Sequence, residues 1–124
     1  MIKEIKKEDI LNYIKVCKKE GLSFNKKKDV IYYGYYKDNI LVGFVGVMYY
    51  RNKAICKNDF VLPEYRNKGI YSELNEYRMQ KINENDIHRI EGSFTDRALP
   101  LHLKNGARIV KKYKICTKVI YENI

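Results

Sequence analysis

The stretch 60–72 contains residues whose types and spacing suit the binding of an anion. It begins as an apolar, strand-like run that Pro63 ends, because proline has no N–H to give to a strand ladder. Gly69 then opens a run that is typical of a helix. The first N–H groups of a helix lack partners and its dipole favours an anion there, and Arg66 and Lys68 add two cations. This order of strand, turn and helix start predicts a phosphate-binding site.

The familiar phosphate motifs do not match this stretch. The Walker pattern needs glycines around a Lys-Ser/Thr pair, which the chain lacks, and the dinucleotide glycine fingerprint is also absent. Instead the chain has Arg-x-x-Gly-x from Arg66 and Gly69, preceded by Val-x-Pro-Glu-Tyr. This resembles the coenzyme A pyrophosphate loop of the GNAT acetyltransferase superfamily, in which glycine or alanine stands at the place of Tyr71. An ordinary strand-to-helix turn with basic surface residues is the alternative.

A second stretch, from Thr95 to Ala107, is similar to another conserved region of the same family, roughly Asn-x-x-Ala-x-x-x-Tyr-x-x-x-Gly-Phe. Ala98 and Gly106 match this pattern as they stand. Thr95 replaces the asparagine, His102 replaces the tyrosine, and Ala107 replaces the phenylalanine. The two partial motifs occur in the family's order and at its spacing.

The resemblance implies direct attack of an amine on the thioester of acetyl-CoA, with one group to protonate the departing thiolate. His102 stands where the family commonly has the tyrosine that acts as general acid, and an imidazole titrates near neutral pH. Tyr113 is a second candidate for the acid. Asp59 and Glu91 are candidates for the general base. For each of these residues a packing or solvated surface role is the alternative.

The resemblance also implies acetyl-CoA as the cofactor. The backbone of the strand before Pro63 would pair with the pantetheine arm as an added strand does. The residues expected to bind the cofactor are Phe60, Val61, Leu62, Arg66, Asn67, Lys68, Gly69, Ile70, Tyr71 and Ser72. No Cys-x-x-Cys or Cys/His cluster indicates a metal site.

Hydrophobic periodicity predicts the elements that position these residues. Their order resembles the GNAT fold, and we expect one α+β domain over residues 1–124, with three α/β/α layers and a mixed, mostly antiparallel central sheet. The expected helices are Lys7–Glu20, Lys68–Asn83 and a run from Asp96 through Lys104. The expected strands are residues 2–5, Val30–Lys37, Ile40–Tyr50, Ala54–Leu62, Ile87–Thr95 and Ala107–Tyr121, the last as one long strand or two.

Composition and charge limit the class of protein. The chain has 124 residues, 45% of them hydrophobic, so it can bury the core of one domain. It has no apolar run long enough to span a bilayer and its first residues lack the core of a signal peptide, so we expect no membrane partner. Cys17, Cys56 and Cys116 are odd in number and widely spaced, which favours reduced thiols and a cytoplasmic location.

The formal net charge of +10 admits an acidic partner, either a nucleic acid or an anionic cofactor. A·T-rich coding DNA also explains the abundance of Lys, Asn, Ile and Tyr. A small basic nucleic-acid-binding protein is therefore the alternative function. An acetyltransferase that acts on a nucleic acid or on an acceptor bound to one combines the two.

The acceptor amine cannot be named from the sequence. The family's acceptor wall corresponds here to the short stretch Leu22–Asp29, which favours an open site for a large acceptor such as a protein, RNA or DNA. The run Lys26–Lys28 would suit a polyanion, and a solvated lysine run is the alternative. The possibility of a homodimer also stays open.

Overall fold

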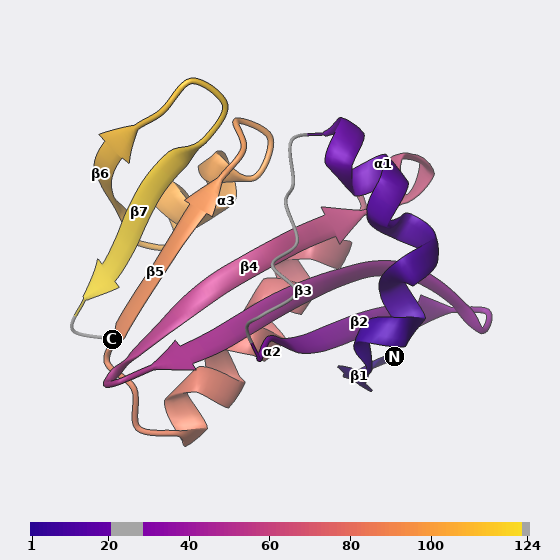
Figure 1. Ribbon diagram of the computed structural model, residues 1–124, viewed down its shortest axis with the longest axis horizontal. Coiled ribbons are helices and arrows are strands. Elements are labelled where there is room, and N and C mark those ends of the chain that lie inside the picture. Colours follow the sequence, from indigo (N-terminus) through magenta and orange to yellow (C-terminus); the bar gives the residue numbers. More distant parts are fainter. Residues whose placement is uncertain (21–28, 123–124) are drawn as a thin grey trace.

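A mixed sheet of seven strands forms the centre of the computed structural model, which describes residues 1–20 and 29–122 (Figure 1). The strand order is β1-β2-β3-β4-β5-β7-β6, and β4 and β5 are parallel while the other pairs are antiparallel. The strands are β1 (Ile2–Ile5), β2 (Ile31–Lys37), β3 (Ile40–Tyr50), β4 (Lys53–Val61), β5 (Arg89–Phe94), β6 (Arg108–Lys112) and β7 (Thr117–Glu122).

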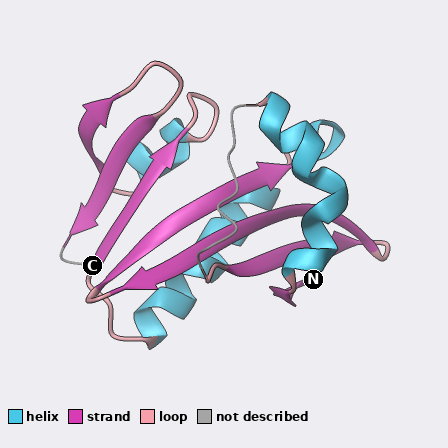
Figure 2. Ribbon diagram, viewed as in Figure 1, coloured by secondary structure: helices cyan, strands magenta, loops and turns pink. Residues whose placement is uncertain are grey.

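Helices cover both faces of this sheet (Figure 2). The helices are the 3-10 turns η1 (Lys7–Tyr13) and η2 (Pro63–Tyr65) and the α-helices α1 (Ile14–Lys19), α2 (Ile70–Glu84) and α3 (Leu99–Lys104). The long helix α2 lies with α3 behind the sheet in Figure 1, and η1 and α1 lie in front of it. The predicted α+β fold with three layers is therefore confirmed.

Two apolar cores lie on the two faces of the sheet. On the α2 face, Leu74 and Ile82 are fully buried against the strands. On the α1 face, Ile10 and Cys17 are fully buried beside Phe44. The seven-residue spacing of this second pair keeps both side chains on the side of the run that faces the sheet.

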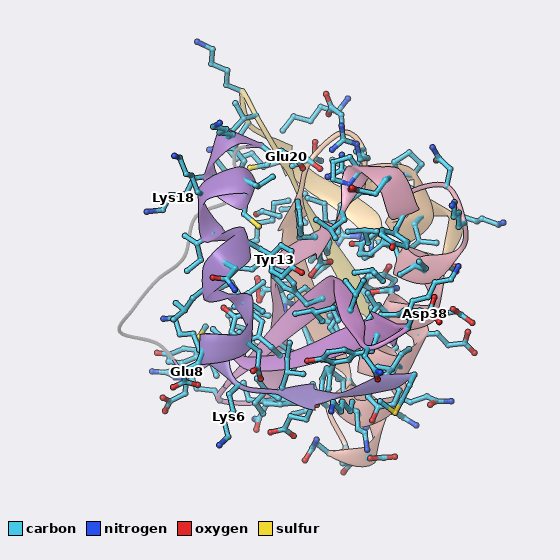
Figure 3. The ribbon with its side chains drawn as sticks, turned by 90° about the vertical axis from the view of Figure 1, so that its right-hand side faces the viewer. Lys6, Glu8, Tyr13, Lys18, Glu20 and Asp38 are labelled. Atoms are coloured by element: carbon cyan, nitrogen blue, oxygen red, sulfur yellow. The ribbon has the colours of Figure 1, made fainter. Side chains whose placement is uncertain are left out.

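The run of η1 and α1 also bonds directly to the sheet. The Tyr13 hydroxyl donates a hydrogen bond of 2.6 Å to the Leu41 carbonyl oxygen. Figure 3 shows Tyr13 pointing from this run towards the sheet and Lys18 pointing away from it. The expected single helix Lys7–Glu20 is wrong in its first half, which is a 3-10 helix. Its start is fixed by the Asp9 carboxylate, which accepts the Lys6 N–H at 2.9 Å.

The C-terminal elements differ from the prediction in two places. The third helix begins at Leu99 rather than Asp96, because the N–H groups of Ala98 and Leu99 bond to the Thr95 carbonyl in a turn. Pro100 lies in the first helical turn, where its missing N–H costs nothing.

The stretch 107–121 is two strands joined by a turn, which settles the alternative that the sequence left open. The Tyr113 N–H closes this hairpin on the Cys116 carbonyl oxygen at 2.8 Å. Tyr113 and Ile115 are therefore exposed at the turn, and neither lies in a strand.

A one-residue bulge in β4 controls the geometry near the end of that strand. Gly46 pairs with Lys57 and Phe44 pairs with Phe60, so β4 has one residue more than β3 between these pairs. Asn58 takes up the extra length with a left-handed φ of 57°. A Cβ on Gly46 would lie 2.6 Å from the Lys57 carbonyl oxygen, so the bulge requires glycine there.

Residues 21–28 lie outside the described residues. They include the Lys26–Lys28 run and most of the expected acceptor wall.

Among the helices that the structure describes, none is long and apolar enough to cross a membrane. Within the described residues, no three His, Cys, Asp or Glu side chains gather as metal ligands would.

Candidate functional site

The sheet opens between β4 and β5. These parallel strands pair only where Lys53–Cys56 faces Arg89–Gly92, and beyond Cys56 the described chain gives β4 no partner on that side. On its other side β4 stays paired with β3 as far as Val61. Figure 1 shows the two strands diverging towards their C-terminal ends. A cavity of about 600 Å³ lies at this opening, and Asp59, Phe60 and Val61 of β4 line it.

The turn from β4 into α2 forms the mouth of the cavity. Asn67 and Gly69 have left-handed φ angles of 62° and 82°, and both line the cavity together with Ile70 and Ser72 from the first turn of α2. No side chain caps this helix start. Its first N–H groups therefore remain available to an anion in the cavity. A Cβ at Gly69 would meet nothing within 4 Å, so the cavity is open at this point.

Arg66 at the mouth is held by two partners. Its Nε donates a hydrogen bond to the Val61 carbonyl oxygen at 2.8 Å, which ties the turn to the end of β4. Its Nη2 donates to both carboxylate oxygens of Glu20, at 2.6 and 2.9 Å. Arg97 also approaches Glu20 at 3.3 Å. A carboxylate of the protein itself thus occupies the guanidinium that the sequence predicts to hold a phosphate.

A closed ring of polar side chains lies beneath the cavity, at its floor. Arg78 is the centre of the ring and is fully buried. It donates to both oxygens of Asp59, at 2.5 and 2.8 Å, to the Gly46 carbonyl at 3.0 Å and to the Asn75 side-chain oxygen at 2.8 Å. Burial lowers the pKa of Arg78 and the Asp59 carboxylate raises it, with an upward net shift, so the guanidinium stays charged.

The ring continues through His102. The Tyr71 hydroxyl donates to Asp59 and lies 2.7 Å from His102 Nε2. On the other side of the imidazole, His102 Nδ1 lies 2.7 Å from the Tyr121 hydroxyl, which also bonds to the Asn75 side chain. The ring thus comprises the side chains of Asp59, Tyr71, Asn75, Arg78, His102 and Tyr121.

The hydrogen bonds of the ring assign the tautomer of His102. Because the Tyr71 proton is given to a carboxylate, the Tyr71 oxygen must accept the proton of His102 Nε2. His102 Nδ1 then accepts the hydroxyl proton of Tyr121. The imidazole also stacks on Phe94, with ring centroids 3.6 Å apart. Both the tautomer and the plane of His102 are therefore fixed.

Burial keeps these groups neutral. It lowers the pKa of His102 to about 4, with the Asp59 charge opposing this shift and Arg78 adding to it. Burial and then the Asp59 carboxylate raise the pKa of Tyr71 well above its usual value. At neutral pH the imidazole therefore carries no charge and the phenol keeps its proton.

The structure brings most of the predicted cofactor residues to one cavity and leaves two outside its wall. Those that line the cavity are Phe60, Val61, Arg66, Asn67, Gly69, Ile70, Tyr71 and Ser72. Leu62 does not line it, and neither does Lys68, whose ammonium lies over the Tyr65 ring at 5.8 Å.

The predicted catalytic residues lie in different places. Asp59 lines the cavity, but both its oxygens already accept protons from Arg78, so the structure does not support it as a free base. His102 is fully buried and meets the cavity only through Tyr71. Tyr113 is half-exposed at the β6–β7 turn, outside the cavity wall. Glu91 pairs with Lys53 at 2.8 Å, away from the cavity.

The sequence interpretation missed several residues of the site. One signal was available for Arg78, which stands between Leu74 and Ile82 at four-residue spacing on the apolar stripe of α2. A charge on such a stripe indicates a buried partner. Glu20 has no comparable signal, because the end of α1 approaches the mouth only in the folded chain. The other missed residues of the wall are Tyr65, Thr95, Asp96, Arg97, Ala98, Leu101 and Ile115.

Comparisons with known proteins place this geometry in a known fold. No family model matches the sequence, and no curated protein matches it. Solved structures do match over nearly the whole chain. An acetyltransferase of the GNAT family from Staphylococcus aureus has a TM-score of 0.81 and 17% identity, with 98% of each chain covered. An IAA acetyltransferase from Bacillus cereus has a TM-score of 0.77 and 15% identity, again with 98% of each chain covered.

A third match carries a ligand. The PaiA N-acetyltransferase from Thermoplasma acidophilum, solved in complex with coenzyme A, has a TM-score of 0.70 and 22% identity. The match covers 94% of this chain and 71% of that one. The chain therefore has the fold of the GNAT acetyltransferases, and the predicted resemblance is confirmed at the level of the fold. The comparisons lend no support to the nucleic-acid-binding alternative.

Proposed function

We propose that this protein is an N-acetyltransferase that transfers an acetyl group from acetyl-CoA to a primary amine. One observation carries the proposal: the opening between β4 and β5 leads directly to the uncapped start of α2. Fold alone does not define an activity. The cavity adds a strand edge and an anion site at its two ends, which together suit a long donor with a diphosphate.

Different residues of the cavity would bind different parts of acetyl-CoA. Beyond Cys56 the edge of β4 that faces β5 offers its backbone groups to the pantetheine arm, as to an added strand. The N–H groups at Gly69 and Ile70 and the guanidinium of Arg66 would hold the diphosphate. The amine then attacks the thioester directly in a ternary complex, and the enzyme supplies position and proton transfer.

The acceptor is a primary amine of unknown identity. An open site would suit a macromolecular acceptor, including a nucleic acid or an amine associated with one, and a mass shift with labelled acetyl-CoA would identify it. The expected cytoplasmic location stays a prediction, and a homodimer stays an alternative to a monomer.

Donor binding tests the proposal with a matched pair of variants. Gly69 and Gly106 both have left-handed φ angles, of 82° and 102°, and a Cβ at either would meet nothing within 4 Å. A glutamate at either position costs similar backbone strain of about 1 kcal/mol, but only residue 69 lines the cavity. We expect coenzyme A to raise the melting temperature of the wild type and of Gly106→Glu, but not of Gly69→Glu.

Isothermal calorimetry with acetyl-CoA measures the same difference directly. A wild-type protein that shows neither a thermal shift nor heat of binding at saturating coenzyme A would overturn the proposal. Equal binding by Gly69→Glu and Gly106→Glu would place the donor elsewhere.

A further inference from the structure

The floor of the cavity presents two of its ring members to a ligand. Tyr71 and Asp59 line the cavity, whereas His102 and Arg78 are fully buried behind them. The oxygens of Asp59 are taken by Arg78 and Tyr71. Tyr71 is therefore the one member of the ring, among the described residues, that carries a hydroxyl proton and also lines the cavity.

We propose that Tyr71 is the catalytic acid of this chain, giving its hydroxyl proton to the sulfur of coenzyme A, and that His102 is the positioning residue that holds the Tyr71 oxygen. This inference rests on the proposed function. It transfers the role from His102, where the sequence motif places it, to a residue of α2.

The place of Tyr71 in the chain fits this role. It is the second residue of α2, next to the N–H groups that would hold the diphosphate, and its ring reaches down to β4 and α3. A donor bound along the edge of β4 with its diphosphate at the mouth would extend towards this floor. One side chain thus joins the anion site to the place where β4 and β5 begin to separate.

The hydrogen bonds of Tyr71 leave its proton transferable. Rotation about the bond between ring and oxygen moves the proton from Asp59 to a new acceptor in the cavity. During that rotation the Nε2–H of His102 still donates to the Tyr71 oxygen and would stabilise a phenolate. Arg78 offsets the charge of Asp59 throughout. The imidazole cannot slide away, because Phe94 stacks on it and Tyr121 holds its other nitrogen.

The protons balance in this scheme. The bond between the amine nitrogen and the acetyl carbon forms, and the bond between that carbon and sulfur breaks. The sulfur takes the proton of Tyr71, and the proton that the nitrogen loses returns to the Tyr71 oxygen through water. No oxidant, metal or further reactant is needed.

A binding experiment tests Tyr71 without knowledge of the acceptor. Coenzyme A and desulfo-coenzyme A differ only in the thiol, so the ratio of their dissociation constants isolates the sulfur. Each unit by which the site lowers the pKa of the coenzyme A thiol strengthens thiolate binding about tenfold. We expect the wild type to prefer coenzyme A increasingly from pH 6 to pH 9, by about tenfold.

Variants separate the two roles. Tyr71→Phe should lose the preference for sulfur while still binding desulfo-coenzyme A. Tyr77→Phe on the same helix, where Tyr77 packs on Tyr33 outside the cavity wall, is the matched control and should keep it. His102→Leu removes the donor to Tyr71 and should weaken the preference, whereas His102→Gln can restore an N–H and should recover part of it.

The outcomes are distinct. If Tyr71→Phe retains the wild-type preference, the inference is overturned while the proposed function stands. If circular dichroism shows that Tyr71→Phe does not fold, the two His102 variants provide the test. An equal preference for coenzyme A over desulfo-coenzyme A in His102→Leu and His102→Gln would then contradict the inference. If the wild type binds neither coenzyme A nor desulfo-coenzyme A, the proposed function itself is overturned.

Discussion

Two arginine–carboxylate pairs, one at the mouth of the cavity and one in the ring at its floor, differ in what surrounds them. At the mouth, Arg66 and Glu20 retain side-chain exposures of 16% and 27%. At the floor, Arg78 and Asp59 retain 0% and 7%. Their geometry differs as well, because Arg66 reaches both Glu20 oxygens with one nitrogen, Nη2, whereas Arg78 donates from Nη1 and Nη2 to separate oxygens of Asp59. The floor pair is therefore both better aligned and less accessible to water than the mouth pair.

This difference separates a replaceable contact from a fixed one. The mouth pair is partly exposed, and under the proposed function an incoming diphosphate would compete with the Glu20 carboxylate for Arg66. At the floor, neither partner can separate without leaving a charge in the protein interior. The same chemical pairing would thus serve as the proposed exchangeable anion site at the mouth, while at the floor it is a rigid support for Tyr71 and His102.

The largest expected effect is on stability. Arg78→Met leaves the Asp59 carboxylate buried without its cation and should lower the free energy of unfolding by about 3–5 kcal/mol. Arg66→Met breaks the mouth pair and should cost about 1 kcal/mol. Urea denaturation of both variants measures the difference. Equal losses in the two variants would remove the distinction between mouth and floor.

The next largest effect is the loss of folding stability at low pH. The pKa of His102 is about 4 in the folded protein, below its ordinary value of 6.5, so the unfolded chain binds a proton over this range and the folded chain does not. Stability is therefore complete above pH 6.5 and falls as pH drops towards 4, by about 3 kcal/mol in all. Unfolding midpoints at several pH values should show this slope in the wild type and a weaker one in His102→Gln. Equal slopes in the wild type and in His102→Gln would mean that His102 is not the source of the pH dependence.

The smallest effect is on affinity at the mouth. Glu20→Gln removes the carboxylate that holds Arg66 and should strengthen coenzyme A binding about fivefold, which corresponds to about 1 kcal/mol. Calorimetric titration at low and high salt measures the gain, which should shrink as salt screens the mouth. Glu64→Gln in the nearby η2 turn, outside the cavity wall, is a matched control for the change in net charge. Unchanged affinity in Glu20→Gln would mean that Glu20 does not compete.

Local sequence signals predicted the elements and the mouth of the site. Pro63 and Gly69 mark the end of β4 and the start of α2, because each restricts the backbone by its own chemistry. The bounds of β3, Ile40–Tyr50, also agree with the sequence, since a continuous apolar run between two turns allows little else.

Contacts between distant segments could not be predicted in the same way. Asp59 and Arg78 are 19 residues apart, and their pairing depends on how α2 crosses β4. Tyr113 shows the opposite error, because its alternation with Ile115 is typical of a strand and no Gly, Pro or Asn marks the turn that contains them. Residue type predicted local shape here, and packing decided which residues meet.

The bulge at Asn58 determines which face of the sheet the later side chains of β4 lie on. Before it, Ala54 and Cys56 face α2, and after it Val61 does, so the alternation of β4 changes its parity at one residue. A β4 that kept all its residues in regular alternation, without the bulge, would turn Asp59 towards the α1 core and Phe60 towards Arg78. The presence of a carboxylate under the cavity therefore depends on the one-residue bulge.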